Sequence, residues 1–129
     1  MFSSGVFDYI NVMDKAADAS WTRNEVLANN IANASTPGYK RQDINFEDQL
    51  RKALKHSKYT SVDAKVSNVR TASLNARIYT DAANFSYRLD GNNVDMDTEN
   101  VELAANQLKY NGLITSINHE FTNLKMVCK

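Results

Sequence analysis

The stretch that decides the fold runs from Leu27 to Arg41 and reads LANNIANASTPGYKR. Apolar side chains recur in it at helical spacing, at Leu27, Ile31 and Ala34, and asparagines lie between them. One face of such a helix is apolar, and another can hydrogen-bond to a neighbouring element through its amides. These amides are Asn29, Asn30 and Asn33.

The second half of the stretch predicts a turn. The ring of Pro37 disfavours the α conformation at Thr36, so the helix ends there. Pro37 and Gly38 suit the two central positions of a type II turn, in which Gly38 takes a positive φ. Tyr39 then follows as an anchor on the outgoing chain.

Upstream of this stretch, apolar residues alternate four and three positions apart, which is a heptad pattern. A helix from residue 4 to 34, capped by Ser3 or Ser4, would be about 45 Å long and would need a partner along its length. Phe7 and Trp21 lie off the strict stripe and widen it, and Trp21 fits a core position and a contact between subunits equally well. The stripe consists of Val6, Ile10, Met13, Ala17, Leu27 and Ile31, with Ser20 and Asn24 filling the intervening positions.

Downstream of the turn, Asn45 is a helix cap, and acidic residues follow it in the first turn. This pattern predicts a short helix that ends near Lys55. Phe46, Leu50 and Leu54 share one of its faces and would dock against the long helices.

From residue 57 to 93 the periodicity weakens, which predicts an irregular, exposed arm. The arm allows some β structure, and Asp90-Gly91 suits a turn. The residues that fit short strands are Val66, Tyr79, Phe85 and Tyr87.

A second long helix is predicted from about Thr98 to Lys125. Asp95, Asp97 and Thr98 are candidate caps, and Glu99 and Glu102 place acids in its first turn. Gly112 lies off the apolar stripe and fits either a close backbone approach or a tolerated glycine. The stripe consists of Leu103, Gln107, Tyr110, Ile114, Ile117, Phe121, Leu124 and Cys128, so that Cys128 is expected to be a buried free thiol.

The predicted fold is mainly α, with the long N-terminal and C-terminal helices packed as a coiled-coil-like pair. Neither helix is stable alone in water, so the two helices are expected to pack against each other through their apolar stripes. The pattern leaves parallel and antiparallel packing open, although a return through the arm favours the antiparallel pair. The chain is expected to be one domain, with a first helix over 1–35, a turn and short helix over 36–56, an arm over 57–93 and a last helix over 94–129.

The composition argues against several classes of function. Lys plus Arg and Asp plus Glu both total 15 in 129 residues, so no net charge attracts nucleic acid. No apolar run approaches the length of a membrane span, and no cleavable secretory signal is recognised. His56 and His119 are isolated, and the glycines are scattered, so no metal site, cofactor site or catalytic cluster is predicted.

The charge is nevertheless uneven along the chain. Residues 51–70 contain six basic residues against Asp63 alone, and residues 90–102 contain five acids and no base. Such blocks are most often solvated faces, but in a self-assembling protein they can also meet across subunits.

The residues Ala28-Asn29-Asn30-Ile31-Ala32-Asn33 and Thr36-Pro37-Gly38-Tyr39 resemble the N-terminal motif of bacterial flagellar rod, hook and hook-associated proteins. A second stretch, Leu89 to Asp97 followed by Glu102 to Tyr110, resembles the C-terminal motif of a proximal rod protein more than that of its relative FlgC. The two motifs cover about half of the chain, and residues 57–88 match no pattern of the family.

The resemblance implies a non-enzymatic subunit that is exported through the flagellar type III apparatus without signal cleavage. In the basal body, across the periplasmic space, it would join the proximal rod, the torque-transmitting shaft with its export channel. Its partners would be other copies of itself, FlgC and the junction protein FliE. The alternatives are an FlgC-like rod protein and a soluble helical secretion adaptor or chaperone.

The residues expected to carry helix packing and assembly come from the two stripes, the amides and the turn. They are Ile10, Met13, Leu27, Asn30, Ile31, Asn33, Pro37, Gly38, Tyr39, Leu103, Asn106, Tyr110, Ile114, Ile117, Phe121 and Leu124.

Overall fold

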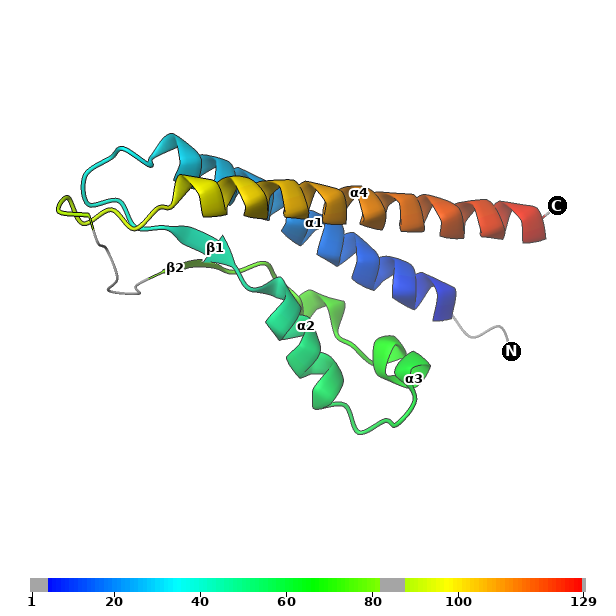
Figure 1. Cartoon of the computed structure of the whole chain (residues 1–129). Helices are drawn as coiled ribbons and strands as arrows, with labels where there is room; N and C mark the ends of the chain where they lie inside the picture. Colours follow the sequence, from blue (N-terminus) through cyan, green and yellow to red (C-terminus); the bar gives the residue numbers. More distant parts are fainter. Residues whose placement is uncertain (1–4, 82–87, 129) are drawn as a thin grey trace.

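The computed structural model describes residues 5–81 and 88–128. Ser3, Ser4, Phe85 and Tyr87 lie outside these residues, so the predicted first cap and two of the strand positions are not described. The elements, in chain order, are α1 (Gly5–Ala32), β1 (Gln42–Ile44), α2 (Phe46–Lys55), α3 (Val62–Ser67), the 3-10 turn η1 (Thr71–Ser73), β2 (Ile78–Thr80) and α4 (Met96–Val127) (Figure 1).

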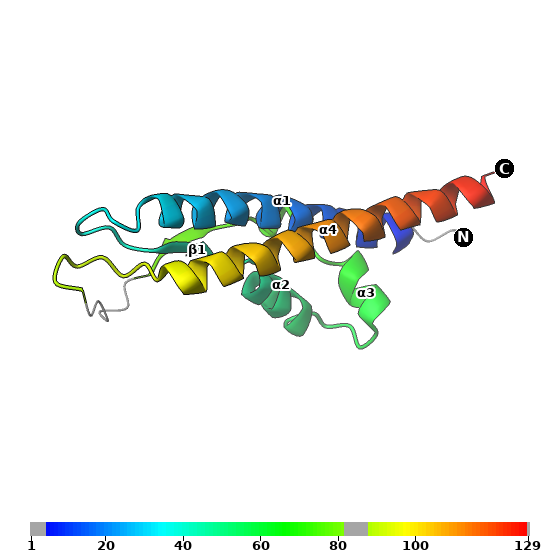
Figure 2. The same ribbon diagram turned by 45° about the horizontal axis from the view of Figure 1, so that its top comes forward.

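The two long helices, α1 and α4, lie against each other and run in opposite directions (Figures 1 and 2). Their side-chain partners show the direction directly. Asn30 bonds Glu99, whereas Ser20, ten residues earlier in α1, bonds Asn106 of α4. The mainly helical fold with paired terminal helices is therefore confirmed, and the packing is antiparallel.

Helix α1 is buried on two faces. Ile10, Ala17 and Leu27 of the predicted stripe are buried. Ala19 and Val26 lie off that stripe and form an apolar core with the middle of the chain. The other buried members of this core are Ile44, Phe46 and Leu74. The long N-terminal helix is thus the central element, with α4 on one side and the strands, α2 and the arm on another.

The turn after α1 has the predicted form. Gly38 has a φ of 72°, and the Tyr39 N–H donates to the Thr36 carbonyl over 3.3 Å. The helix ends at Ala32, two residues earlier than predicted, because its last turn tightens: the Ala34 N–H donates to the Ile31 carbonyl rather than to the residue four positions back.

The short helix α2 also agrees with its sequence signals. The Asn45 side chain accepts a hydrogen bond from the Asp48 N–H, and the helix ends at Lys55. Phe46 is buried in the apolar core, and Leu50 packs against that core. Leu54 is half-buried.

The arm is more ordered and less exposed than predicted. β2 pairs antiparallel with β1, with Asp43 opposite Tyr79, so Tyr79 is a strand residue as predicted. Val66 is not, since it lies in α3. Val66 and Leu74 are both buried, and α3 and η1 contact α1. The description as exposed and irregular is therefore wrong for these parts of the arm.

Helix α4 begins earlier than predicted, and its stripe has a different register. Asp95 is the cap and accepts hydrogen bonds from the Asp97 and Thr98 N–H groups. Asn106 is 1% exposed, whereas Gln107 is exposed, so the assignment of Gln107 to the stripe is wrong. Glu99, Leu103, Asn106 and Tyr110 form the observed row.

The C-terminal part of α4 is only partly covered by the described chain. The two long helices diverge toward their N-terminal and C-terminal ends (Figure 1). No described residue of α4 after Asn106 is buried. Cys128 is therefore exposed, and the prediction of a buried thiol is wrong. A Cβ added at Gly112 would meet nothing within 4 Å, so no backbone approaches it closely.

None of the described helices has the length and low polarity needed to cross a membrane.

Candidate functional site

The two sequence motifs, far apart in the chain, are hydrogen-bonded to each other. The Gly38 N–H donates to the Asp90 carbonyl over 2.8 Å, and the Arg41 N–H donates to Asn93 Oδ1 over 2.7 Å. The buried Asn92 Nδ2 donates to three carbonyls of the segment that directly follows α1. These acceptors are the carbonyls of Asn33, Ala34 and Thr36, at 2.9, 3.0 and 2.9 Å.

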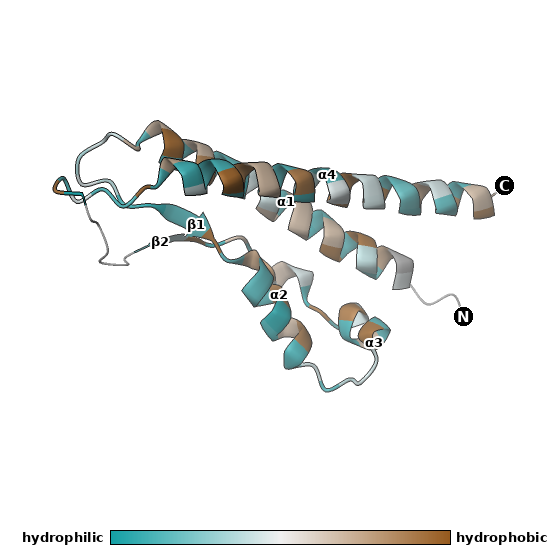
Figure 3. Cartoon of the chain, viewed as in Figure 1, coloured by the Kyte–Doolittle hydropathy of each residue, from teal (hydrophilic) through white to brown (hydrophobic). Residues whose placement is uncertain are grey.

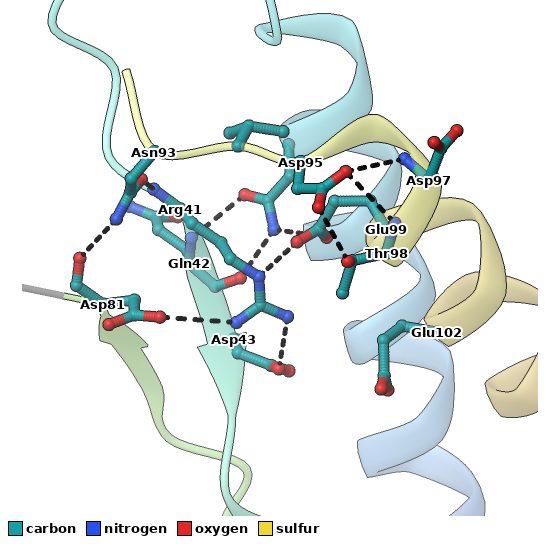
Figure 4. A network of polar contacts seen from close by, with 12 residues as sticks. Arg41, Gln42, Asp43, Asp81, Asn93, Asp95, Asp97, Thr98, Glu99 and Glu102 are labelled. Atoms are coloured by element: carbon teal, nitrogen blue, oxygen red, sulfur yellow. Dashed lines mark hydrogen bonds and ion pairs between the residues drawn. The ribbon is translucent and has the colours of Figure 1, made fainter. Parts of the chain in front are cut away.

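Next to this junction, Arg41 lies in the middle of an ionic network (Figure 4). Its guanidinium donates to Asp43 Oδ2 over 2.8 Å and to Glu99 Oε1. A longer ion pair of 3.9 Å joins it to Asp81. One side chain therefore connects β1, α4 and Asp81, the residue that follows β2.

Arg23 connects α1 to the same network. It donates from Nε and Nη2 to both oxygens of Asp43, over 2.7 and 3.0 Å, which is the strong bidentate arrangement. Nη2 also donates to Glu102 of α4 over 2.9 Å. The Asp43 side chain is 8% exposed and holds both arginines. Most of β1 is hydrophilic in Figure 3, although Asp43 and Ile44 are buried.

The network shifts the protonation equilibria of its members. Burial alone would raise the pKa of Asp43, but hydrogen bonds from Arg23, the Ile44 N–H and Arg41 outweigh it and hold the pKa below its usual value. The hydrogen bonds that Arg23 donates to Asp43 raise the pKa of Arg23 despite its burial. Burial alone would lower the pKa of Arg41, but the hydrogen bonds to Glu99 and Asp43 and the charges of these two residues outweigh it and raise the pKa. All three groups are therefore charged at neutral pH.

Asn30 satisfies its side chain completely from three elements. Nδ2 donates to the Gln42 carbonyl over 2.7 Å and to Glu99 Oε2 over 3.0 Å. Oδ1 accepts from the Gln42 N–H and from the Tyr39 hydroxyl, at 3.0 and 3.1 Å. The predicted anchor, Tyr39, thus holds the turn against α1 through this amide. Burial, and then the charge of Glu99, raise the pKa of Tyr39, so its hydroxyl stays protonated as the donor.

This arrangement positions helices rather than reacting groups. Every charge in the network is matched by an opposite charge or an amide, and the described residues contain no cluster of three His, Cys, Asp or Glu side chains suited to a metal ion. Buried polar partners of this kind penalise a shifted helix register, because a shift would leave them unpaired.

The structure places the predicted packing residues at different depths. Pro37, Gly38 and Phe121 are exposed, and Asn33 bonds the Asn29 carbonyl of its own helix. Ile10, Leu27, Asn30 and Asn106 are buried. The partly buried ones are Met13, Ile31, Asn33, Tyr39, Leu103, Tyr110, Ile114, Ile117 and Leu124. Their role in assembly stays a prediction.

Sequence reasoning missed the network itself. Glu99 was expected to act on the helix dipole, yet it is fully buried against Arg41 and Asn30. A signal was present, since Glu99 lies four residues before Leu103 on the stripe of α4. Trp21, left open between core and subunit contact, is 56% exposed, with its ring 5.8 Å from that of Tyr110.

Residues 11–40, which include the whole of the first motif, match the family model described as flagella basal body rod protein. The fold and the interlocked terminal motifs thus belong to a rod protein of the bacterial flagellum. The flagellar basal body rod protein FlgB of Bacillus subtilis (strain 168) is 32% identical over 98% of this chain and 95% of its own length. FlgB of Escherichia coli (strain K12) is 35% identical over 81% of each chain, and FlgB of Buchnera aphidicola subsp. Acyrthosiphon pisum is 35% identical over 92% of each.

The chain belongs to the FlgB family of flagellar basal body rod proteins. The resemblance read from the two motifs is confirmed, and so is a structural rather than an enzymatic role.

Proposed function

We propose that this chain is a structural subunit of the proximal rod that assembles through the parts of α1 and α4 that its own fold leaves uncovered. The observation that carries this proposal is the exposed apolar surface in the C-terminal half of α4. In that half Phe121, Met126 and Val127 are 44, 61 and 83% exposed. A helix with exposed apolar side chains gains stability when another helix covers them.

The neighbours in this proposal are further copies of the chain and other rod proteins, FlgC and FliE among them. Packed together, such subunits form a shaft that transmits torque and surrounds an export channel. The opposite ends of α1 and α4, which are held together by the polar network, act as the rigid part of each subunit.

Export as an unfolded chain through the flagellar type III apparatus, without signal cleavage, also fits the packing. Of the largest fully buried side chains in the described structure, Leu27 alone is apolar. The others are Glu99, Asn30, Asn92 and Asn106. Since apolar burial supplies most of the stability of a fold, a core of this composition is expected to unfold easily before assembly.

The test is complementation. Deleting the gene in the source bacterium is expected to abolish flagella, and the wild-type chain is expected to restore them. Ile117→Asp places a charge on the half-buried face of α4 and should fail to restore them. Asn118→Asp adds the same charge at the next, exposed position and serves as the matched control. Normal flagella in the deletion strain would refute the proposal.

A further inference from the structure

Helix α1 has a third face, on which none of the described elements packs. One face carries Ala19 into the apolar core, and a second bonds Asn106 of α4 through the Ser20 carbonyl. The residues of the third face follow one another at intervals of four, three and four positions, so they lie on one side of the helix, and all are exposed. This outer face of α1 consists of Asp14, Asp18, Trp21 and Glu25.

The chemistry of the outer face fits a basic partner. Among the described residues, the ion pairs of α1 are made by Arg23, and the three acids of the outer face take part in none. Trp21 lies between two of these acids, and Tyr110 supports one side of its ring, with the ring centroids 5.8 Å apart. More than half of Trp21 is open to solvent. An exposed indole attracts a cation to its ring face, and nearby carboxylates strengthen that attraction.

The acidic block at residues 90–102 does not offer a comparable surface. Asp90, Glu99 and Glu102 have arginine partners inside the molecule. Asp95 accepts the hydrogen bonds that cap α4. The acids of this block are thus largely used within the fold, and the acids that stay unpaired side by side are those of the outer face of α1.

The matching positive charge lies on the other side of the apolar core. α2 and α3 lie to one side of the two long helices (Figures 1 and 2). Phe46 of α2 points into the core, whereas Lys52, Lys55 and the following Lys58 are exposed. Of the bases on this side of α2 only Arg51 is ion-paired in the described structure, with an acid of its own helix. The core lies between the outer face of α1 and this lysine face of α2, so the two faces point in different directions and meet only between molecules.

We infer that the outer face of α1, with Trp21 at its centre, docks on the lysine face of α2 in a second copy of the chain. The inference rests on the proposed function, since it concerns how one subunit meets the next. In the contact a lysine ammonium lies over the indole of Trp21, between Asp18 and Glu25. The two faces are different surfaces of one molecule, so the contact is head-to-tail and extends from copy to copy in one direction.

Charge-swapped variants of the full-length chain test the inference in solution. The acid variant carries Asp18→Lys and Glu25→Lys, and the lysine variant carries Lys52→Glu and Lys55→Glu. By sedimentation velocity, the wild-type chain should self-associate, and each variant should do so about tenfold more weakly, because like charges then face each other. A combined variant with all four changes should regain the wild-type association, because its two faces are complementary again.

Trp21 also gives a direct readout, because it is the only tryptophan of the chain. Its fluorescence emission should shift to shorter wavelength as the wild-type chain associates, since the contact displaces water from the indole. Raising the salt concentration from about 50 to about 500 mM should reverse both the shift and the association, because salt screens exposed charges. Contacts through the apolar side chains of α4 would persist at the higher salt concentration.

The matched control has the net charge of the combined variant but no complementary faces. It joins the two changes of the acid variant to Arg77→Glu and Lys125→Glu, at two exposed bases outside the lysine face. This control should associate as weakly as the acid variant does. Circular dichroism should show that all variants keep the wild-type helix content.

A wild-type chain that stays monomeric at millimolar concentration, or single-face variants that associate as tightly as it does, would overturn the inference. So would a folded combined variant that stays monomeric, a control that associates as the wild type does, or association that leaves the Trp21 emission unchanged. Each of these results leaves the proposed function standing, because the exposed apolar surface of α4 is untouched. Normal flagella in the deletion strain would count against that function alone.

Discussion

Asn30 of α1 donates a hydrogen bond from Nδ2 to Glu99 Oε2 of α4 over 3.0 Å, and both residues are fully buried. Asn30 belongs to the first sequence motif, and Glu99, 69 positions later, lies between the two parts of the second. The contact joins the end of the first long helix to the start of the second. Register between the two helices is therefore set here by polar partners, because sliding either helix by one turn would leave a buried carboxylate and a buried amide unpaired.

Replacing Asn30 with Leu is expected to destabilise the chain by about 3 kcal/mol, since it leaves Glu99, the Gln42 backbone and the Tyr39 hydroxyl without their partner. Asn33→Leu is the matched control, because the Asn33 amide donates within its own helix. Its cost should stay below about 1 kcal/mol. Urea unfolding followed by circular dichroism measures both, and equal losses would show that the Asn30 contacts do not set stability.

The depressed pKa of Asp43 predicts an acid-sensitive fold. An acid whose pKa is lower in the folded chain stabilises the fold fully above its unfolded pKa, and the stabilisation is lost as the pH falls through the folded value. The free energy of unfolding should therefore fall from about pH 5 downward. Asp43→Asn should cost about 3 kcal/mol at pH 7, because it leaves Arg23 and Arg41 undercompensated, and it should flatten the acid limb.

Asp14→Asn is the control for this experiment, since Asp14 is exposed. Urea unfolding at pH 7 and pH 3 distinguishes the two variants. If Asp43→Asn loses as much stability between these pH values as the wild type does, the acid sensitivity arises from other carboxylates.

Local signals in the sequence predicted the elements whose geometry is decided locally. Gly38 and Asn45 are examples, because a positive φ and a helix cap depend on the residue and its immediate neighbours. Asn106 and Gln107 show where this fails. Both are amides of similar helical preference, and only the Ser20 carbonyl on another helix decides which one is buried.

The polar network could not be predicted from the sequence for the same reason, since its partners are far apart in the chain. Arg41 and Glu99 are 58 residues apart, and the sequence does not say that the turn carries one to the other. The pairing of β1 with β2 is likewise non-local. The second buried face of α1 escaped notice because alanines supply much of it, with Ala16 and Ala19 giving only a weak apolar signal.

Cys128 should behave as an accessible thiol in the isolated chain. It is exposed at the end of α4, where no described residue covers it. A thiol reagent such as dithionitrobenzoate should therefore modify the native protein at about the rate of the urea-unfolded protein. Labelling that is slowed by tenfold or more in the native monomer would show that the end of α4 is covered before assembly.

Alanine at Gly38 and alanine at Gly112 should change the stability of the fold in opposite directions. Gly38 has a φ of 72°, and a Cβ added there would meet no atom within 4 Å, so the cost of Gly38→Ala comes from backbone strain and not from a clash. That cost is about 1–2 kcal/mol for an L-residue. Gly112 lies within α4, also in open space, and alanine there should stabilise the helix by about 1 kcal/mol. Thermal unfolding of the two variants beside the wild type measures the contrast. Because the substitution is the same and neither site is crowded, a loss at Gly112 as large as at Gly38 would mean that the left-handed turn at Gly38 is not the source of the strain.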